Sequence, residues 1–207
     1  MTKKATLLSV IVIVAVILGI GIGVVAKQSA YEKYDKLFTA AKNYKKDKTV
    51  AAIVNGDKIY KYQVDIQLAA QKLSQANMAE AGGDPTLITQ RTEDKILDDL
   101  IRNAVLLQEA KAQKLTAKYS EAKEYQEEQL SIVKAADDEQ TRFYEQYIDE
   151  MGWTEKEYLK QVSLQWQKVM TRANLYNKFF EDNPDATDET WKKYVDSLVE
   201  NADIEYK

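Results

Sequence analysis

Residues 50–65 read VAAIVNGDKIYKYQVD and place two short apolar stretches on either side of an Asn-Gly pair. Both residues of the pair tolerate the positive φ angles that a type I′ turn requires, so the pattern predicts a β-hairpin. We expect residues 49–55 to pair with residues 57–61. A two-stranded ribbon is only marginally stable by itself, so it should lie against helices. The segment from Ala202 to Tyr206 is a candidate third strand for the same sheet.

The rest of the sequence after the hairpin has the apolar spacing of helices, with large apolar residues three and four positions apart. Thr154 opens a capping box with Glu157, and Thr187 can cap a last helix. The fold class is therefore mainly α, with one small β element. We expect helices over residues 62–77, 92–115 and 120–150, from Thr154 to about residue 182, and from Thr187 to about residue 200.

Two of these helices carry wide apolar stripes that predict a buried core. In the helix over residues 92–115 the stripe is wide enough for packing inside a bundle. In the helix after Thr154 it is formed by large aliphatic and aromatic residues. From these stripes we expect four residues to lie in the core, namely Leu100, Ile101, Leu107 and Trp166.

The N-terminal part of the chain predicts a membrane anchor. Residues 5–26 are uncharged and rich in Val, Ile and Leu, and as a helix they would span about 33 Å, enough to cross a bilayer. Residues 1–4 carry two lysines, which by the positive-inside rule predicts a cytoplasmic tail and an extracytoplasmic remainder. A cleaved signal peptide is the alternative, although its apolar region is usually only about 7 to 15 residues long. An amphipathic juxtamembrane helix over residues 27–48 and a helical domain over residues 49–207 would follow.

Gly19 and Gly23 form a GxxxG pattern within the predicted membrane segment. Small residues at this spacing let two membrane helices approach closely. The motif is also common by chance, so a homodimer formed through these glycines is one interpretation and an ordinary lipid-facing helix is the other.

The composition excludes several classes of function. The chain has no cysteine and no histidine, so disulfides, thiolate chemistry and the commonest general base and metal ligand are all missing. Adjacent carboxylates such as Asp98 and Asp99 point to different sides of a helix and do not form a site together. A net charge of −4 argues against nucleic acid as a partner. We expect no cofactor and no catalytic centre, and an enzyme that uses carboxylates alone is the least favoured alternative.

Three motifs together resemble the chaperone domain of SurA- and PrsA-type foldases. The hairpin and helix entry of residues 50–65 are similar to the opening of that domain. Residues 96–110, ILDDLIRNAVLLQEA, resemble its central helix. Residues 187–194, TDETWKKY, resemble the helix that precedes the parvulin isomerase domain in these proteins. Each motif is weak alone, but their order and spacing agree over residues 49–200.

The resemblance implies a bacterial chaperone that binds unfolded or newly exported polypeptides outside the cytoplasmic membrane. Prolyl isomerase activity is not implied, because the sequence ends near where a parvulin domain would begin and lacks the histidines that such sites use. The lipobox cysteine usual in PrsA is also missing. The alternative is a non-catalytic scaffold that docks one specific membrane or envelope partner.

Three residues beside the apolar stripes are candidates for polypeptide binding. These are Tyr144, Trp153 and Met170. Methionine and aromatic side chains suit a surface that accepts varied apolar segments, because their contacts do not depend on a fixed hydrogen-bond pattern. The opposite interpretation is that all three lie in the core.

Overall fold

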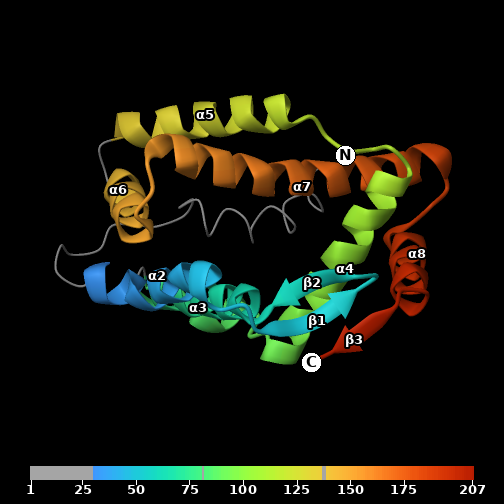
Figure 1. Ribbon diagram of the computed structural model, residues 1–207, viewed down its shortest axis with the longest axis horizontal. Helices are drawn as coiled ribbons and strands as arrows, with labels where there is room; N and C mark the ends of the chain where they lie inside the picture. The colour runs from blue at the N-terminus through green and yellow to red at the C-terminus, as the bar shows by residue number, and fades with distance from the viewer. Residues whose placement is uncertain (1–29, 81, 137–138) are drawn as a thin grey trace.

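The structure is a computed structural model that describes residues 30–80, 82–136 and 139–207 (Figure 1). It contains a three-stranded antiparallel sheet with the order β2-β1-β3. Strands β1 (Val50–Val54) and β2 (Asp57–Tyr60) form the predicted hairpin. Asn55 and Gly56 in its turn have φ angles of 49° and 85°, as the Asn-Gly pair predicts. Strand β3 (Ile204–Tyr206) pairs with β1, which confirms the candidate third strand.

Helices make up most of the remaining described chain, so the prediction of a mainly α fold is confirmed. A single 3₁₀ turn, η1, covers Pro85–Leu87 after the Gly-Gly break that ends α3. The α-helices are α2 (Ala30–Lys46), α3 (Lys61–Glu80), α4 (Glu93–Ala112), α5 (Tyr119–Ala136), α6 (Glu139–Met151), α7 (Glu155–Asp182) and α8 (Asp188–Glu200).

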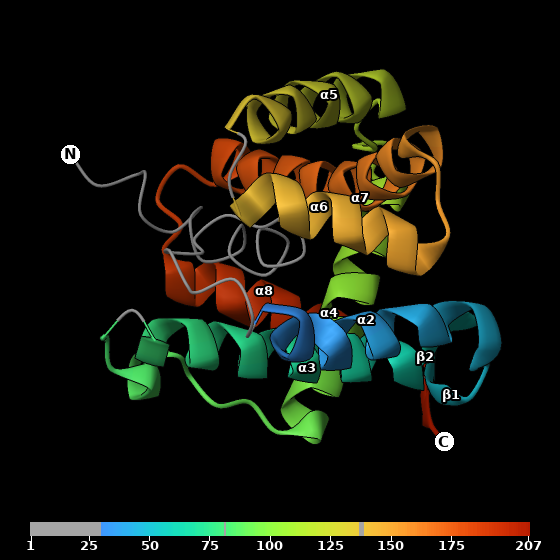
Figure 2. The same ribbon diagram turned by 90° about the vertical axis from the view of Figure 1, so that its left-hand side faces the viewer.

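The helices form two layers that α4 connects. In Figure 1, α5 lies along α7 in one layer, and α2 and α3 lie beside the sheet in the other. Helix α4 crosses between the layers and contacts α3, α7, α8 and both strands of the hairpin. Figure 2 shows α6 beside α7, above the helices α2 and α3. Figure 1 also shows α6 at one end of the molecule and α8 at the other, where α8 meets the C-terminal half of α7.

Three apolar clusters hold these elements together. One joins α2, α3 and α6 around Tyr34 and Phe38, which are 1% and 2% exposed. A second lies between the sheet and α4, where Ile101 is 1% exposed and Val54 is fully buried. A third joins α5, α6 and the start of α7 around Leu130 and Tyr158. The hairpin is thus covered by helices, as its marginal stability requires.

Helix ends follow the predicted capping signals. Thr154 accepts a hydrogen bond from the backbone N–H of Glu157, whose carboxylate accepts one from the backbone N–H of Thr154. Thr187 caps α8 through the backbone N–H of Thr190. Such caps satisfy backbone donors that a helix start leaves without partners, and each is worth about 1 kcal/mol.

The helix predicted over residues 120–150 is wrong in one respect, because the structure has two helices there. Helix α5 ends at Ala136 and α6 begins at Glu139. The apolar residues continue through both helices, but α5 packs on α7 whereas α6 also contacts α2. Apolar spacing indicates which residues are covered, but it does not say that one straight helix covers them.

Of the four predicted core residues, only Ile101 is fully buried. Leu100 and Leu107 are half-buried, and Leu100 packs at the edge of the cluster between the sheet and α4. Trp166 is half-buried and stacks on Tyr125, with ring centroids 4.7 Å apart. The deepest positions of α4 include smaller residues, because the hairpin and α7 approach this helix closely from different sides.

The predicted membrane segment of residues 5–26, with Gly19 and Gly23, lies outside the described residues. Within the part of the chain that the structure does describe, no helix is both long and apolar enough to cross a bilayer. The predicted juxtamembrane helix over residues 27–48 corresponds to α2. Its apolar side packs on α3 and α6.

Candidate functional site

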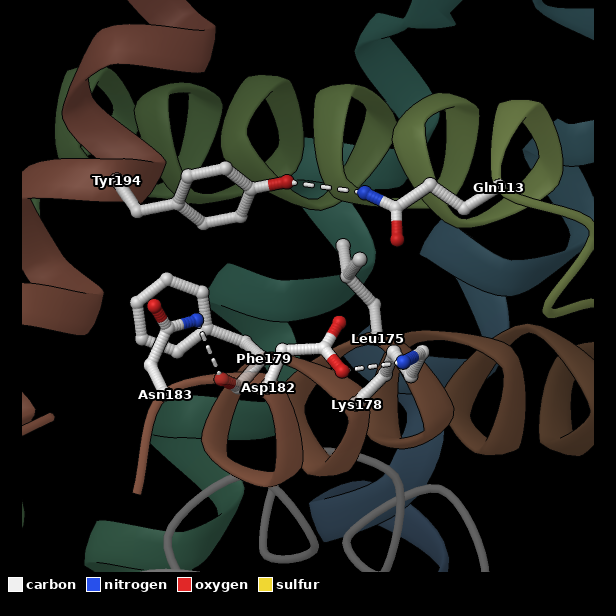
Figure 3. Close-up of a pocket in the computed structure, with 7 residues that line it drawn as sticks. All are labelled: Gln113, Leu175, Lys178, Phe179, Asp182, Asn183 and Tyr194. Atoms are coloured by element: carbon white, nitrogen blue, oxygen red, sulfur yellow. Dashed lines mark hydrogen bonds and ion pairs between the residues drawn. The ribbon is translucent and has the colours of Figure 1, made fainter. Parts of the chain in front are cut away.

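A small open pocket of about 220 Å³ lies where the end of α4, the C-terminal half of α7 and α8 meet. Figure 3 shows its lining, which combines apolar walls with a polar rim. Leu175 and Phe179 come from α7, and Tyr194 from α8. The polar residues around it are Gln113, Lys178, Asp182 and Asn183.

Beside this pocket, α7 and α8 share five aromatic residues, which we call the α7/α8 aromatic cluster. All five are half-buried, so each ring presents part of its surface to solvent. Phe179 is central, with its ring centroid 5.2 Å from that of Trp191 and 5.0 Å from that of Tyr194. Such ring pairs are worth about 0.5 to 1.5 kcal/mol beyond their buried area. The cluster consists of Tyr176, Phe179, Phe180, Trp191 and Tyr194.

Local sequence signals bring these rings together. Helix α7 ends at Asp182, and the Nδ2 group of Asn183 donates to the carbonyl of Phe179 at 2.8 Å. Pro184 cannot continue the ladder of helical hydrogen bonds, and Thr187 starts α8. Because the connection is short, the first turns of α8 lie against the last turns of α7.

The polar rim is held by hydrogen bonds between α4 and α8. The hydroxyl of Tyr194 donates to Oε1 of Glu109 at 3.2 Å, and Nε2 of Gln113 lies 3.3 Å from the same hydroxyl. Partial burial raises the pKa of Tyr194, and the charge of Glu109 raises it further. The phenol therefore stays neutral and acts as a donor at physiological pH. Lys178 and Asp182 form an ion pair on the other side of the pocket.

The three residues predicted for polypeptide binding lie elsewhere. Tyr144 is 6% exposed in the cluster of α5, α6 and α7, where its hydroxyl donates to Oε2 of Glu155 at 3.1 Å. Burial raises its pKa to about 12, with a further contribution from Glu155. Trp153 is half-buried and packs against the same cluster. Their role in binding stays a prediction, and Tyr144 has little surface with which to perform it.

Met170 is also half-buried, on α7. It precedes Phe179 by nine residues, and helical periodicity places the two on opposite sides of α7. The structure therefore brings Tyr144 and Trp153 together and leaves Met170 apart from both them and the pocket.

Sequence reasoning missed the α7/α8 aromatic cluster as a site. Tyr176 and Phe180 belong to the apolar stripe of α7 and were expected in its core, and Trp191 was only one of several large apolar residues. A usable signal was present, because five aromatic residues occur between positions 176 and 194. Spacing shows which of them share a side of α7 or of α8, but it does not show how much of that side another element covers.

The described part of the chain has no group of three or more carboxylates that could hold a metal ion. The pocket and the α7/α8 aromatic cluster place apolar rings beside amide groups and one ion pair. This arrangement can offer a ligand apolar contact area and hydrogen bonds.

Comparison with known proteins agrees with the resemblance carried by the first two motifs, at residues 50–65 and 96–110, whereas the third, at residues 187–194, lies outside the matched region. No curated protein and no solved structure matches the chain. Residues 2–170 match the family described as the SurA-like N-terminal domain. The match covers most of the sequence, including the hairpin and the helices from α2 through most of α7. The chain is therefore a member of the SurA-like N-terminal domain family.

Proposed function

We propose that this protein is a membrane-anchored chaperone that binds unfolded or newly exported polypeptides outside the cytoplasmic membrane, without catalysing prolyl isomerisation. Family membership supports the chaperone class. The observation that carries the binding proposal is the α7/α8 aromatic cluster, whose five residues are only half-buried and two of which, Phe179 and Tyr194, line an open pocket.

The physical character of this surface suits broad and weak binding. Its rings can bury apolar side chains of a client, at roughly 25 cal/mol for each Å² of apolar area removed from water. Apolar contacts with the rings do not depend on a fixed hydrogen-bond pattern, so many sequences would be accepted. Ordering an unfolded chain on the surface costs conformational entropy, which keeps the individual affinities modest.

The anchor is part of the same proposal. The apolar segment of residues 5–26 would keep the domain at the membrane, where exported chains emerge, and the lysines of residues 1–4 would stay in the cytoplasm. Membrane fractionation followed by N-terminal sequencing tests it. We expect the full chain in the membrane fraction, and a mature protein that begins near Lys27 would contradict the anchor.

The binding proposal is tested by suppression of aggregation. The full-length chain, added at near-stoichiometric ratios, should reduce the aggregation of several unrelated unfolded proteins. A double variant with Tyr176→Ser and Trp191→Ser should lose most of this effect. Tyr125→Ser is the control, because Tyr125 is a partly exposed aromatic of α5 that stacks on Trp166 and does not belong to the α7/α8 aromatic cluster.

The same experiment separates the chaperone from the scaffold. Binding to a single envelope protein with no effect on unrelated clients would favour the scaffold. Equal loss of activity in the Tyr125 control would show that the α7/α8 aromatic cluster is not the binding surface. Thermal melting of each variant establishes that the compared proteins are folded.

A further inference from the structure

Three cations on α7 and the adjoining end of α4 lack acidic partners within the described residues. We call Lys111, Lys168 and Arg172 the basic group. Lys168 and Arg172 are one turn apart on α7, and Lys111 is in the last turn of α4, which packs on α7. Among the described residues none of the three forms an ion pair or a side-chain hydrogen bond, although many other lysines and arginines of the chain do.

Within the basic group, Lys111 and Lys168 are exposed and Arg172 is half-buried. Desolvation lowers the pKa of Lys168, and the neighbouring charges of Lys111 and Arg172 lower it further. Arg172 is half-buried, and desolvation lowers the pKa of its guanidinium. A partly desolvated cation without a counter-ion costs free energy, and a carboxylate brought to it would recover part of that cost.

The basic group and the aromatic cluster lie on one side of α7. Lys168, Arg172, Leu175 and Phe179 are separated by four, three and four residues, which is the spacing of a single helical face. Leu175 lines the pocket and is only 1% exposed, so the accessible area of this face comes from the exposed Lys168 and the half-buried Arg172 and Phe179. From Lys168 to Phe179 this face extends about 16 Å along the helix axis. An extended peptide advances about 3.3 Å per residue, so about five residues would cover it.

The charges differ at the two ends of this face. Near the pocket, the charge of Asp182 is balanced by its ion pair with Lys178, whereas Glu109 accepts a hydrogen bond from the neutral Tyr194. The carboxylate of Glu109 therefore repels an acidic group at the aromatic end. At the other end the basic group attracts one, so the surface would bind an acidic and apolar segment in a single orientation.

We propose that the polypeptides bound by this protein carry an Asp or Glu side chain about three to five residues from an aromatic or large aliphatic residue, with the carboxylate at Lys168 and Arg172 and the apolar side chain at the α7/α8 aromatic cluster. This inference rests on the proposed function and specifies its substrate class. It also explains why a chain of net charge −4 keeps three cations together without acidic partners.

The test compares two synthetic peptides that differ in one functional group. One carries Glu four residues from Trp, and the other has Gln in place of Glu. Titration of full-length protein should show about three- to tenfold tighter binding of the Glu peptide at low salt, a difference that shrinks as salt is added. The double variant K168Q/R172Q should bind both peptides equally, at the wild-type affinity for the Gln peptide.

The matched control is K156Q/K160Q, which removes two charges from exposed positions near the start of the same helix. It should keep the preference for the Glu peptide. A preference that survives in K168Q/R172Q, or is lost in both double variants, overturns the inference. Equal binding of both peptides by the wild type overturns it while the proposed function stands, whereas binding of neither peptide overturns both.

A competing occupant of the basic group is an anionic lipid surface. Vesicles of phosphatidylglycerol and phosphatidylcholine distinguish the two. If K168Q/R172Q weakens vesicle binding and the wild type shows no preference between the peptides, the cations serve the membrane and the inference is overturned. The inference is supported if the wild type prefers the Glu peptide and all three proteins bind vesicles equally. The basic group would then bind polypeptide and not lipid.

Discussion

Two aromatic clusters among the described residues are built alike and exposed differently. In the cluster that joins α2, α3 and α6, which we call the α2/α6 cluster, the rings of Tyr34 and Phe143 meet edge to face with their centroids 4.7 Å apart, and the residues are 1% and 6% exposed. In the α7/α8 cluster, Tyr176 and Trp191 are in edge contact at 5.2 Å, yet both are half-exposed. Similar ring contacts therefore occur in the buried core and at the surface. The exposed fraction differs because a further helix covers only one of the two clusters.

That covering element is α3 in the first cluster. Helices α2, α3 and α6 enclose the rings from several sides, whereas α7 and α8 form a corner with an open pocket beside it. A buried ring contributes mainly to stability, because its whole surface is removed from water on folding. A half-exposed ring contributes less to stability and keeps area for a ligand.

The largest expected effect is at Phe38 in the α2/α6 cluster. Phe38→Ala should lower the free energy of unfolding by about 3 to 5 kcal/mol, because this ring is 2% exposed and its loss leaves a cavity. Urea unfolding followed by circular dichroism measures it. A loss below about 1 kcal/mol would show that the α2/α6 cluster is not the more deeply buried of the two.

The next effect depends on pH and concerns Tyr144. Its folded pKa of about 12 lies above the unfolded value near 10, so the folded state holds this proton more tightly. The associated stability is fully present below pH 10 and is lost as the pH rises toward 12, by at most about 2 to 3 kcal/mol.

Unfolding experiments on Tyr144→Phe isolate this contribution. The variant should be about 1 kcal/mol less stable at neutral pH, because it lacks the hydrogen bond to Glu155. Above pH 10 its stability should fall less steeply than that of the wild type. Parallel pH profiles of the two proteins would mean that Tyr144 is not the buried donor seen here.

A smaller loss of stability is expected for Trp191→Ala in the α7/α8 cluster. The ring is half-exposed, so about 1 to 2 kcal/mol should be lost, against 3 to 5 for Phe38→Ala. Client binding should weaken more than threefold. If Trp191→Ala lowers the free energy of unfolding as much as Phe38→Ala does and leaves client binding unchanged, Trp191 is a core residue and not part of a binding surface.

The smallest effect is expected at Tyr125, which is 37% exposed and stacks on Trp166. Tyr125→Ser should cost less than about 1 kcal/mol, the value of one exposed ring pair. Aggregation assays should find client binding unchanged, because neither ring lines the pocket. A marked loss of binding would extend the surface along α5 and α7.

Particular residues show how far sequence reasoning reached. The Asn55-Gly56 turn and the Thr154 cap were predictable, because each depends on local backbone preferences and on partners a few residues away. The split between α5 and α6 was not, since apolar spacing continues across it. The core positions of α4 were only partly predictable, because burial there depends on how closely the hairpin and α7 approach.

The sequence by itself determined the mainly helical class, the hairpin with its third strand, the helix caps and the likeness to SurA-type chaperone domains. These follow from backbone conformation and from hydrophobic periodicity, which act over a few residues. Only the tertiary structure decided that Tyr144 lies in the core, that Tyr176 and Trp191 stay half-exposed, and that Lys111 from α4 joins Lys168 and Arg172 of α7. Burial and charge proximity depend on which distant segments cover a side chain, and the local sequence does not specify those segments.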